Sequence, residues 1–162
     1  MATVDLDPTN QPSDSHEKDA LGKPAWEVAL LYPPQGSWSE QDYWALEGGR
    51  LIDFEDGQVE VHDVPTKEHQ RIVLFLYRCF FAHVQAHFPG EVLTAPLPVH
   101  LWKDKFREPD VIVVSRARTD YCGYPDGADL VVEVVSDDPT SRRRDLETKT
   151  NEYAQAGVPE YW

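Results

Sequence analysis

Apolar residues are distributed unevenly along the chain, and the pattern changes near residue 25. Residues 1–24 show almost no apolar periodicity and are dominated by Asp, Pro, Ser, Thr and Gln. Such a segment cannot bury enough apolar surface to offset the entropy lost on ordering. We therefore predict a disordered acidic N-terminal tail over 1–24 and a single globular domain over 25–162, a length that suits one core.

The first half of this domain predicts a short helix, a hairpin and a long helix. Ser39 followed by Asp42 and then by apolar residues is typical of a capped helix start. Two alternating apolar runs flank Asp56-Gly57, which indicates a hairpin with a tight turn. Between residues 66 and 88 apolar side chains recur every three or four positions, as in an amphipathic helix that Pro89-Gly90 would end.

The second half predicts strands that lie in the centre of a sheet. Extended runs cover 91–95 and 97–102, and a charged turn at 103–105 follows them. The runs at 111–114 and 129–135 are apolar at consecutive positions, which is typical of strands covered by helices on both faces. The pattern predicts an α/β domain with buried strands.

Two acidic residues lie where burial makes a charge costly. Asp110 begins one apolar run, and Glu133 lies inside the other, 23 positions later (133 − 110). This spacing allows two neighbouring strands and the loop between them. Two adjacent carboxylates repel unless a proton or a cation lies between them, and Mg²⁺ is typically held by one or two carboxylates plus phosphate and water. The alternative is a structural role in which Glu133 pairs with a buried Arg or Lys.

Lys149 is the third candidate for this site. In a helix predicted from about residue 142 to 156, Leu146, Lys149 and Tyr153 are three and four positions apart and share one face. We therefore expect Lys149 to point inward, where an ammonium group can stabilise a phosphate transition state or orient a water molecule. The alternative is an exposed i,i+4 ion pair with Asp145.

Charge bears on the partner of the protein. The formal net charge is −14, which disfavours a protein that grips DNA through phosphate contacts. The local basic groups include Arg142, Arg143 and Arg144 at the start of the last helix, which we interpret as candidate contacts to a nucleic-acid backbone. A solvated charged face is the alternative for these arginines.

Other classes of protein are disfavoured by what the sequence lacks. No apolar run approaches the roughly 20 residues that span a bilayer, and the N-terminus has no secretory signal pattern, so a cytoplasmic protein without membrane association is expected. Cys79 and Cys122 have no partner spacing typical of zinc or disulfides. His83 and His87 are at i,i+4, but without a third ligand we expect them to be solvent-exposed.

Several strings taken together resemble a known family. The chain is similar to the Uma-type (Uma-two) family of bacterial restriction endonucleases, once a domain of unknown function, in the PD-(D/E)XK nuclease superfamily. The resemblance covers about residues 37–162. It is carried by Glu108-Pro109-Asp110-Val-Ile-Val-Val, Asp129-Leu-Val-Val-Glu133-Val-Val-Ser136, Asp145-x-x-x-Lys149-x-x-x-Tyr153 and Ala156-Gly157-Val158-Pro159-Glu160-Tyr161-Trp162.

The resemblance implies a restriction-endonuclease-like α/β (α+β) core, with a mixed central sheet flanked by helices. It implies that Asp110 and Glu133 bind Mg²⁺ or Mn²⁺ and act in catalysis. The superfamily's usual lysine lies two positions after the glutamate, where this chain has Val135, and Lys149 matches the place of a lysine on the following helix. Lys149 is therefore expected as the catalytic lysine.

The resemblance also points to two additional site residues and to a shortened end. Asp53 and His69 match family positions and would complete the metal shell, although a turn acid and a helix-start histidine are the plain alternatives. Family members continue past Tyr161-Trp162 with a further strand and hairpin, so we interpret the end at Trp162 as a truncation. A missing strand would expose a sheet edge, and a homodimer or an unstable domain is the expected consequence.

The leading hypothesis is a metal-dependent endonuclease that hydrolyses phosphodiester bonds, with DNA as the expected nucleic acid. The first alternative is a nuclease-fold protein without catalysis that serves as a binding or scaffold module, which the acidic charge favours. A glycosidase that uses Asp110 and Glu133 as its acid pair is a third hypothesis, but it leaves Lys149 without a role.

Overall fold

The computed structural model describes residues 32–46, 51–62, 64–87, 89–135 and 142–162. The predicted tail over 1–24 lies outside the described residues. The chain divides into two compact units, residues 1–33 and 34–162. The described helices and strands, all in the second unit, are α3 (Glu40–Trp44), β1 (Ile52–Glu55), β2 (Gln58–Val61), α4 (Lys67–His87), β3 (Gly90–Thr94), β4 (Val99–Trp102), β5 (Lys105–Arg107), β6 (Val111–Ser115), β7 (Asp120–Tyr121), β8 (Tyr124–Pro125), β9 (Leu130–Val132), the π-helix η1 (Arg144–Lys149), α6 (Thr150–Gln155) and β10 (Glu160–Tyr161).

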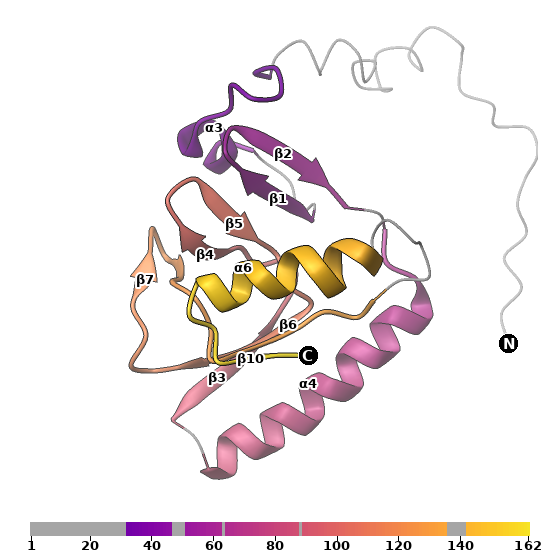
Figure 1. The fold of residues 1–162 in the computed structure, drawn as a ribbon. Helices are drawn as coiled ribbons and strands as arrows, with labels where there is room; N and C mark the ends of the chain where they lie inside the picture. The colour runs from indigo at the N-terminus through magenta and orange to yellow at the C-terminus, as the bar shows by residue number, and fades with distance from the viewer. Residues whose placement is uncertain (1–31, 47–50, 63, 88, 136–141) are drawn as a thin grey trace, which may run out of the picture. The chain divides into compact units, whose positions relative to one another are not determined.

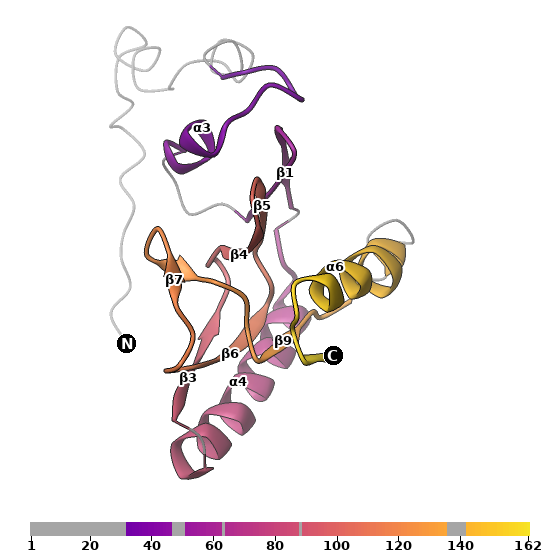
Figure 2. The same ribbon diagram turned by 60° about the vertical axis from the view of Figure 1, so that its left-hand side comes forward.

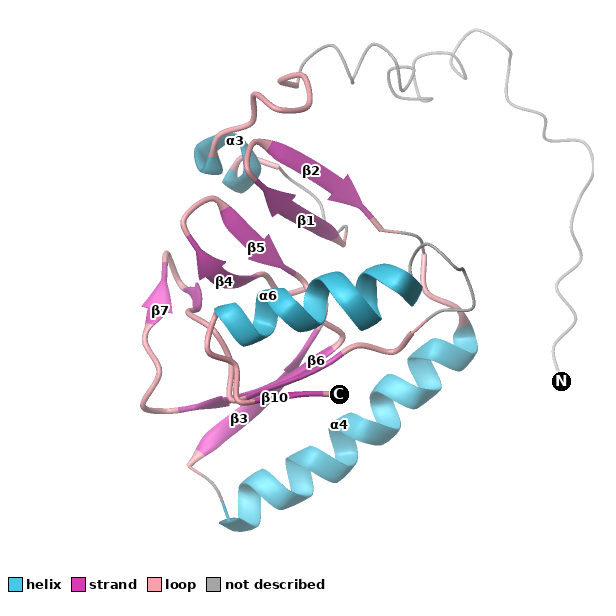
Figure 3. Ribbon diagram, viewed as in Figure 1, coloured by secondary structure: helices cyan, strands magenta, loops and turns pink. Residues whose placement is uncertain are grey.

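The strands form two four-stranded sheets and one small two-stranded sheet of β7 and β8 (Figures 1 and 3). The first sheet has the order β2-β1-β5-β4, and its neighbours are antiparallel. The second has the order β10-β9-β6-β3 and is mixed, because β10 runs parallel to β9 while β9, β6 and β3 are antiparallel neighbours. The predicted α/β fold with a mixed sheet is confirmed.

Strand β6 is buried on both faces, which explains its unbroken apolar sequence. Its side chains alternate between two cores, since Ile112 contributes to a cluster with Tyr153 of α6, while Val113 contributes to a cluster with Val73 and Val84 of α4. Helices α4 and α6 accordingly lie on opposite faces of the second sheet (Figures 1 and 2). The two-sided burial that the sequence predicted follows from this sandwiching.

The first sheet has an aromatic core of its own beneath α3. Tyr43 of α3 stacks on Phe54 and Phe106, with ring centroids 5.3 and 5.4 Å apart. Ser39 caps α3 and forms a reciprocal capping box with Asp42, so the short helix has a defined start. This cap orients α3 so that Tyr43 is buried against the sheet.

Two turns keep the elements in register. Asp56 and Gly57 both have positive φ, 44° and 80°, as a two-residue hairpin turn between β1 and β2 requires. Gly157 has φ of 73° directly after α6, and the Val158 amide donates to the Tyr153 carbonyl at 2.9 Å, which is a Schellman ending. The hairpin predicted around Asp56-Gly57 is confirmed.

Three local expectations were wrong. Lys105 belongs to β5 rather than to a turn, and only 1% of it is exposed, because carboxylates surround its ammonium group. Strand β9 ends at Val132, so Glu133 lies just beyond the strand. Leu146 is 53% exposed although Lys149 and Tyr153 are buried, because the π-helical hydrogen bonding of η1 rotates Leu146 away from the face they share.

None of the helices in the described ranges is long and apolar enough to cross a membrane. The long helix α4 exposes apolar side chains on its outer face, but its polar residues interrupt every window of bilayer length.

The aromatic core of the first sheet generates a stability prediction. Phe106 is fully buried among aromatic rings, whereas Phe81 is 44% exposed on α4. Replacing Phe106 by Ala leaves a cavity, so we expect Phe106→Ala to lower the free energy of unfolding by about 3–5 kcal/mol. Urea denaturation followed by circular dichroism measures this, and the control Phe81→Ala should lose less than about 1 kcal/mol. Equal losses in the two variants would contradict the assignment of this core.

Candidate active site

The register of the second sheet brings Asp110 and Glu133 together. Val111 of β6 pairs with Val132 of β9 in the antiparallel ladder, so the residues just outside this pair, Asp110 and Glu133, face each other at the end of the two strands. The Val134 amide donates to Asp110 Oδ2 at 2.7 Å, which ties the two chain segments together. The neighbouring placement of these two acids, expected from their spacing, is therefore found.

Lys149 and Tyr153 hold one oxygen of Glu133. The Lys149 Nζ and the Tyr153 hydroxyl donate to Glu133 Oε1 at 2.8 and 2.9 Å. The inward orientation expected for Lys149 is found, and so is its alternative partner, since Lys149 Nζ also lies 3.2 Å from Asp145 Oδ1. In the part of the chain that the structure describes, Glu133 Oε2 accepts no hydrogen bond.

Burial strongly affects the pKa values of Glu133 and Lys149. Burial raises the pKa of Glu133 to about 7, Lys149 opposes the shift, and the nearby charge of Asp110 adds to it. Burial opposes a charged Lys149, yet Glu133, Asp53 and Asp145 outweigh it and raise the pKa of this ammonium. Lys149 thus carries a proton at neutral pH, beside a carboxyl group whose ionised form is disfavoured by burial.

His69 and Asp53, the two additional candidate site residues, have different partners. His69 Nε2, at the start of α4, lies 3.2 Å from Asp110 Oδ2. Asp53 lies in β1, only 1% exposed, and contacts His62 Nε2 at 3.0 Å. Burial opposes ionisation of Asp53, but His62 and Arg107 outweigh burial and hold its pKa well below its ordinary value. Asp53 is therefore an ionised, internally paired acid rather than a turn residue.

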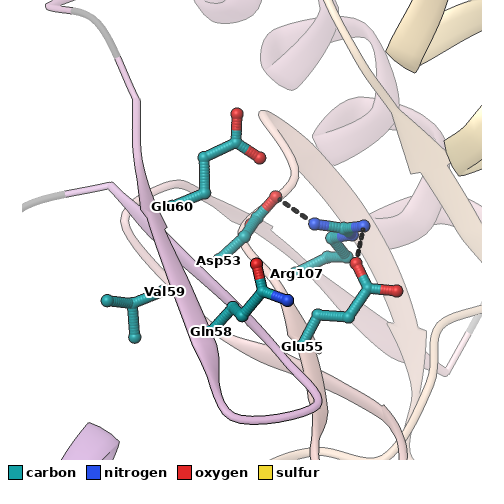
Figure 4. Close-up of a pocket in the computed structure, with 6 residues that line it drawn as sticks. All are labelled: Asp53, Glu55, Gln58, Val59, Glu60 and Arg107. Atoms are coloured by element: carbon teal, nitrogen blue, oxygen red, sulfur yellow. Dashed lines mark hydrogen bonds and ion pairs between the residues drawn. The ribbon is translucent and has the colours of Figure 1, made fainter. Parts of the chain in front are cut away.

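A pocket of about 310 Å³ opens beside Asp53. Figure 4 shows the Arg107 side chain between the carboxylates of Asp53 and Glu55. Arg107 is paired with both of these carboxylates. The pocket wall is therefore polar, but the charge of Arg107 in it is already paired. The pocket is lined by Asp53, Glu55, Gln58, Val59, Glu60 and Arg107.

The sequence was compared with known families and structures. The family model of Uma2, with the description "Putative restriction endonuclease", matches residues 35–162, which is more than half of the chain. The chain belongs to the Uma2 family. Membership of this family supports a nuclease function in general. No curated protein matches the sequence.

A solved structure shares the fold of this Uma2 chain. It is the "Crystal structure of a putative nuclease belonging to DUF820 from Anabaena variabilis", with a TM-score of 0.55 and 16% sequence identity. The match covers 71% of this chain and 64% of that chain. At this identity the likeness shows the fold alone. It agrees with a restriction-endonuclease-like α/β core.

Sequence reasoning missed the charged residues that surround the Uma2 site. Arg107 and Glu152 form a buried pair, and Glu108 Oε2 is buried without a hydrogen bond among the described residues. Burial and the charge of Asp53 raise the pKa of Glu108 to about 7. The available signal was Phe106 between two basic residues directly before the Glu-Pro-Asp string, an alternation typical of a strand.

The three consecutive arginines take separate positions. Arg142 and Arg143 are exposed, and Arg143 Nε lies 3.0 Å from Glu147 Oε2. Arg144 is half-buried and forms an ion pair with Glu60 of β2. Arg142 and Arg143 are thus the accessible members, while Arg144 connects η1 to the hairpin.

The donor set of the Uma2 site can be tested against a divalent ion. Within the described residues, no group of three or more His, Cys, Asp or Glu side chains is arranged to hold a metal. Mg²⁺, however, needs only one or two carboxylates, with water and phosphate oxygens completing its shell. Asp110 and Glu133 lie opposite each other at the end of β6 and β9, and burial together with the charge of Asp110 raises the pKa of Glu133. The carboxylate pair therefore fits a hard divalent cation.

The Glu152 pair generates a prediction about pH. Burial opposes ionisation of Glu152, but hydrogen bonds from Arg107 and Lys105 outweigh burial and lower its pKa in the folded state. Its contribution to stability is therefore present above the unfolded pKa of about 4.5 and is lost as the pH falls through the lowered folded value. We expect Glu152→Gln to lower the free energy of unfolding by about 3 kcal/mol at pH 7 and by much less near pH 3.

Urea denaturation of wild type and Glu152→Gln at pH 7, 5, 4 and 3 measures this difference. The matched control is Glu147→Gln, on the exposed side of the same helical segment, which should change stability by less than about 1 kcal/mol at every pH. A difference for Glu152→Gln that stayed constant from pH 7 to pH 3 would show that the ionised carboxylate does not contribute.

Proposed function

We propose that the protein is a metal-dependent endonuclease that hydrolyses phosphodiester bonds, with DNA as its nucleic acid. The observation that carries this proposal is the shared acceptor of Lys149 and Tyr153. Both donate to Glu133 Oε1, so among the described residues Glu133 Oε2 is left without a hydrogen bond, close to Asp110. Two carboxylates that can hold a divalent ion, with an ammonium beside them, are groups that metal-dependent hydrolysis of a phosphodiester can use.

Asp110 and Glu133 would hold a Mg²⁺ or Mn²⁺ ion. Such an ion, when bound, lowers the pKa of a coordinated water and neutralises charge on the phosphate. Lys149 keeps its proton because the acids around it raise its pKa. Its ammonium group can therefore donate to an attacking water or to a phosphate oxygen while it remains paired with Glu133.

Surrounding residues restrict how the acids can move. The Val134 amide fixes one oxygen of Asp110, and His69 Nε2 lies beside the same oxygen. His69 therefore contacts Asp110 at the oxygen that the Val134 amide already holds. Preorganised acids lose little entropy when substrate and ion bind, which favours catalysis over binding alone.

Cleavage assays test the proposed function. We expect the purified protein to cut supercoiled plasmid with Mg²⁺ or Mn²⁺ but not with EDTA. Glu133→Gln and Lys149→Met should each lower the cleavage rate by about 10²-fold or more, since each removes a group used in the transition state. Single-stranded DNA and RNA, assayed in parallel, define the nucleic acid.

The matched controls are Glu160→Gln and Lys103→Met, which change exposed residues of the same type. Both should cut at the wild-type rate. A folded wild type that cut none of these nucleic acids with either ion would overturn the proposal and favour the binding or scaffold module. Cutting that persisted in EDTA would overturn its metal dependence.

The exposed arginines generate a separate prediction about nucleic-acid binding. If Arg142 and Arg143 contact phosphates, each contact releases counterions, so the affinity depends on salt. We expect the double variant Arg142→Gln/Arg143→Gln to reduce the slope of log affinity against log salt by about 1.8 for a duplex. Fluorescence anisotropy with labelled DNA and Ca²⁺ in place of Mg²⁺ measures the slope. An unchanged slope would assign these arginines to the solvated face.

A further inference from the structure

Arg107 is a buried cation that is fully engaged with acids. Its Nε and Nη2 donate to the two carboxylate oxygens of Glu152, each at 2.8 Å, so the pair is bidentate. Its Nη1 donates to Asp53 at 2.9 Å and its Nη2 to Glu55 at 3.0 Å. All three guanidinium nitrogens thus donate to carboxylates, and the residue is only 3% exposed.

This geometry is unsuited to binding a phosphate. A guanidinium that contacts substrate needs accessible N–H groups, whereas those of Arg107 are taken by acids of its own chain. The interaction instead connects the first sheet to the last helix, because Arg107 and Asp53 lie in β5 and β1 and Glu152 lies in α6. Lys105 of β5 reinforces the connection, with its Nζ 2.7 Å from Glu152 Oε1.

The same short helical segment carries the groups that hold Glu133. Lys149 precedes Glu152 by three positions, and Tyr153 follows it directly. A planar bidentate pair fixes both the distance and the rotation of its partner, which a single ion pair does not. The rotation of this segment is not set by regular helix geometry alone, because π-helical η1 changes to α-helical α6 between Lys149 and Thr150.

We propose that Arg107 is a positioning residue that acts through Glu152. The bidentate pair fixes the rotation of α6 so that Lys149 and Tyr153 both reach Glu133 Oε1. This inference rests on the proposed function in one respect, since it gives the catalytic role of Lys149 a structural support. Arg107 itself contacts neither the substrate nor the reacting water.

The test uses two variants of the bidentate pair and two matched controls. Arg107→Lys keeps the positive charge but cannot form a planar pair, and Glu152→Gln keeps the shape but loses the charge. The controls are Arg78→Lys, on the exposed surface of α4, and Glu147→Gln, on the exposed side of the same helical segment, and they make the same changes at exposed residues. An osmolyte such as trimethylamine N-oxide keeps destabilised variants folded during the measurements.

The first measurement is the ¹⁵N resonance of the Lys149 ammonium group, which is observable when burial and hydrogen bonds slow its proton exchange. We assign it by its loss in Lys149→Met. In Glu152→Gln we expect the resonance to broaden or disappear, and in Glu147→Gln we expect it unchanged. An unchanged Lys149 resonance in folded Glu152→Gln would overturn the inference, whatever the loss of stability.

The second measurement separates kcat from KM for DNA cleavage at saturating Mg²⁺. We expect Arg107→Lys and Glu152→Gln to lower kcat by about 10-fold or more, with KM changed less than about 2-fold, and both controls to match the wild type. Wild-type kcat in the folded fraction of both variants would show that the pair serves stability alone and would overturn the inference. If the wild type does not cut, the proposed function fails, and the Lys149 resonance alone decides the positioning role.

Discussion

The carboxylate of Glu133 is buried beneath α6, and the arrangement of the surrounding residues follows from the cost of that burial. An ionised acid in such a place requires hydrogen-bond donors and positive charge. Lys149 and Tyr153 supply two donors to one oxygen, yet the pKa of Glu133 stays raised to about 7. The two donors therefore do not fully offset the cost of burying this carboxylate beside Asp110.

Charged residues connect the surroundings of Glu133, at the end of the second sheet, to the first sheet. Lys149 lies close enough to Asp53 for the two charges to influence each other's pKa, and Asp53 is in turn held by Arg107. Arg107 also donates hydrogen bonds to Glu152 of α6, which lies one helical turn beyond Lys149. These residues thus form a connected network of charges around α6. The loss of one member leaves another charge buried and unpaired.

The sequence carried enough information for the strands and for the acid pair. Asp110 and Glu133 stand out because apolar runs surround them, and their separation fits two neighbouring strands. Helical spacing indicated that Lys149 points inward, the family resemblance implied a catalytic role for it, and the side chain is buried in the structure. A periodic pattern of apolar residues is a local signal, so it locates buried elements and the acids that interrupt them.

The charged network could not be predicted in the same way. Lys105 and Arg107 lie in a strand of three residues, too short for the alternation around Phe106 to be decisive, and the charges at 103–105 suggested a turn. Their partner Glu152 is 45 positions away from Arg107 in the chain (152 − 107), so only the fold reveals the pair. The prediction that Leu146 shares a face with Lys149 and Tyr153 was wrong for another reason. A face drawn with α-helical spacing does not apply to the π-helical η1.

The net charge constrains how such a site can meet a nucleic acid. Residues 1–24 hold five acids and two basic residues, which leaves −11 for residues 25–162 (−14 + 3). The acidic balance therefore belongs to the domain and not mainly to the tail. Internal pairs such as Arg107 with Glu152 leave this total unchanged, but they remove basic groups from the surface. A polyanion can then approach where positive charge is exposed, as at Arg143, and under the proposed function also at a cation that Asp110 and Glu133 would hold. Such a domain would bind nucleic acid weakly in the absence of divalent ions, which links substrate binding to the same carboxylates that would carry out the chemistry.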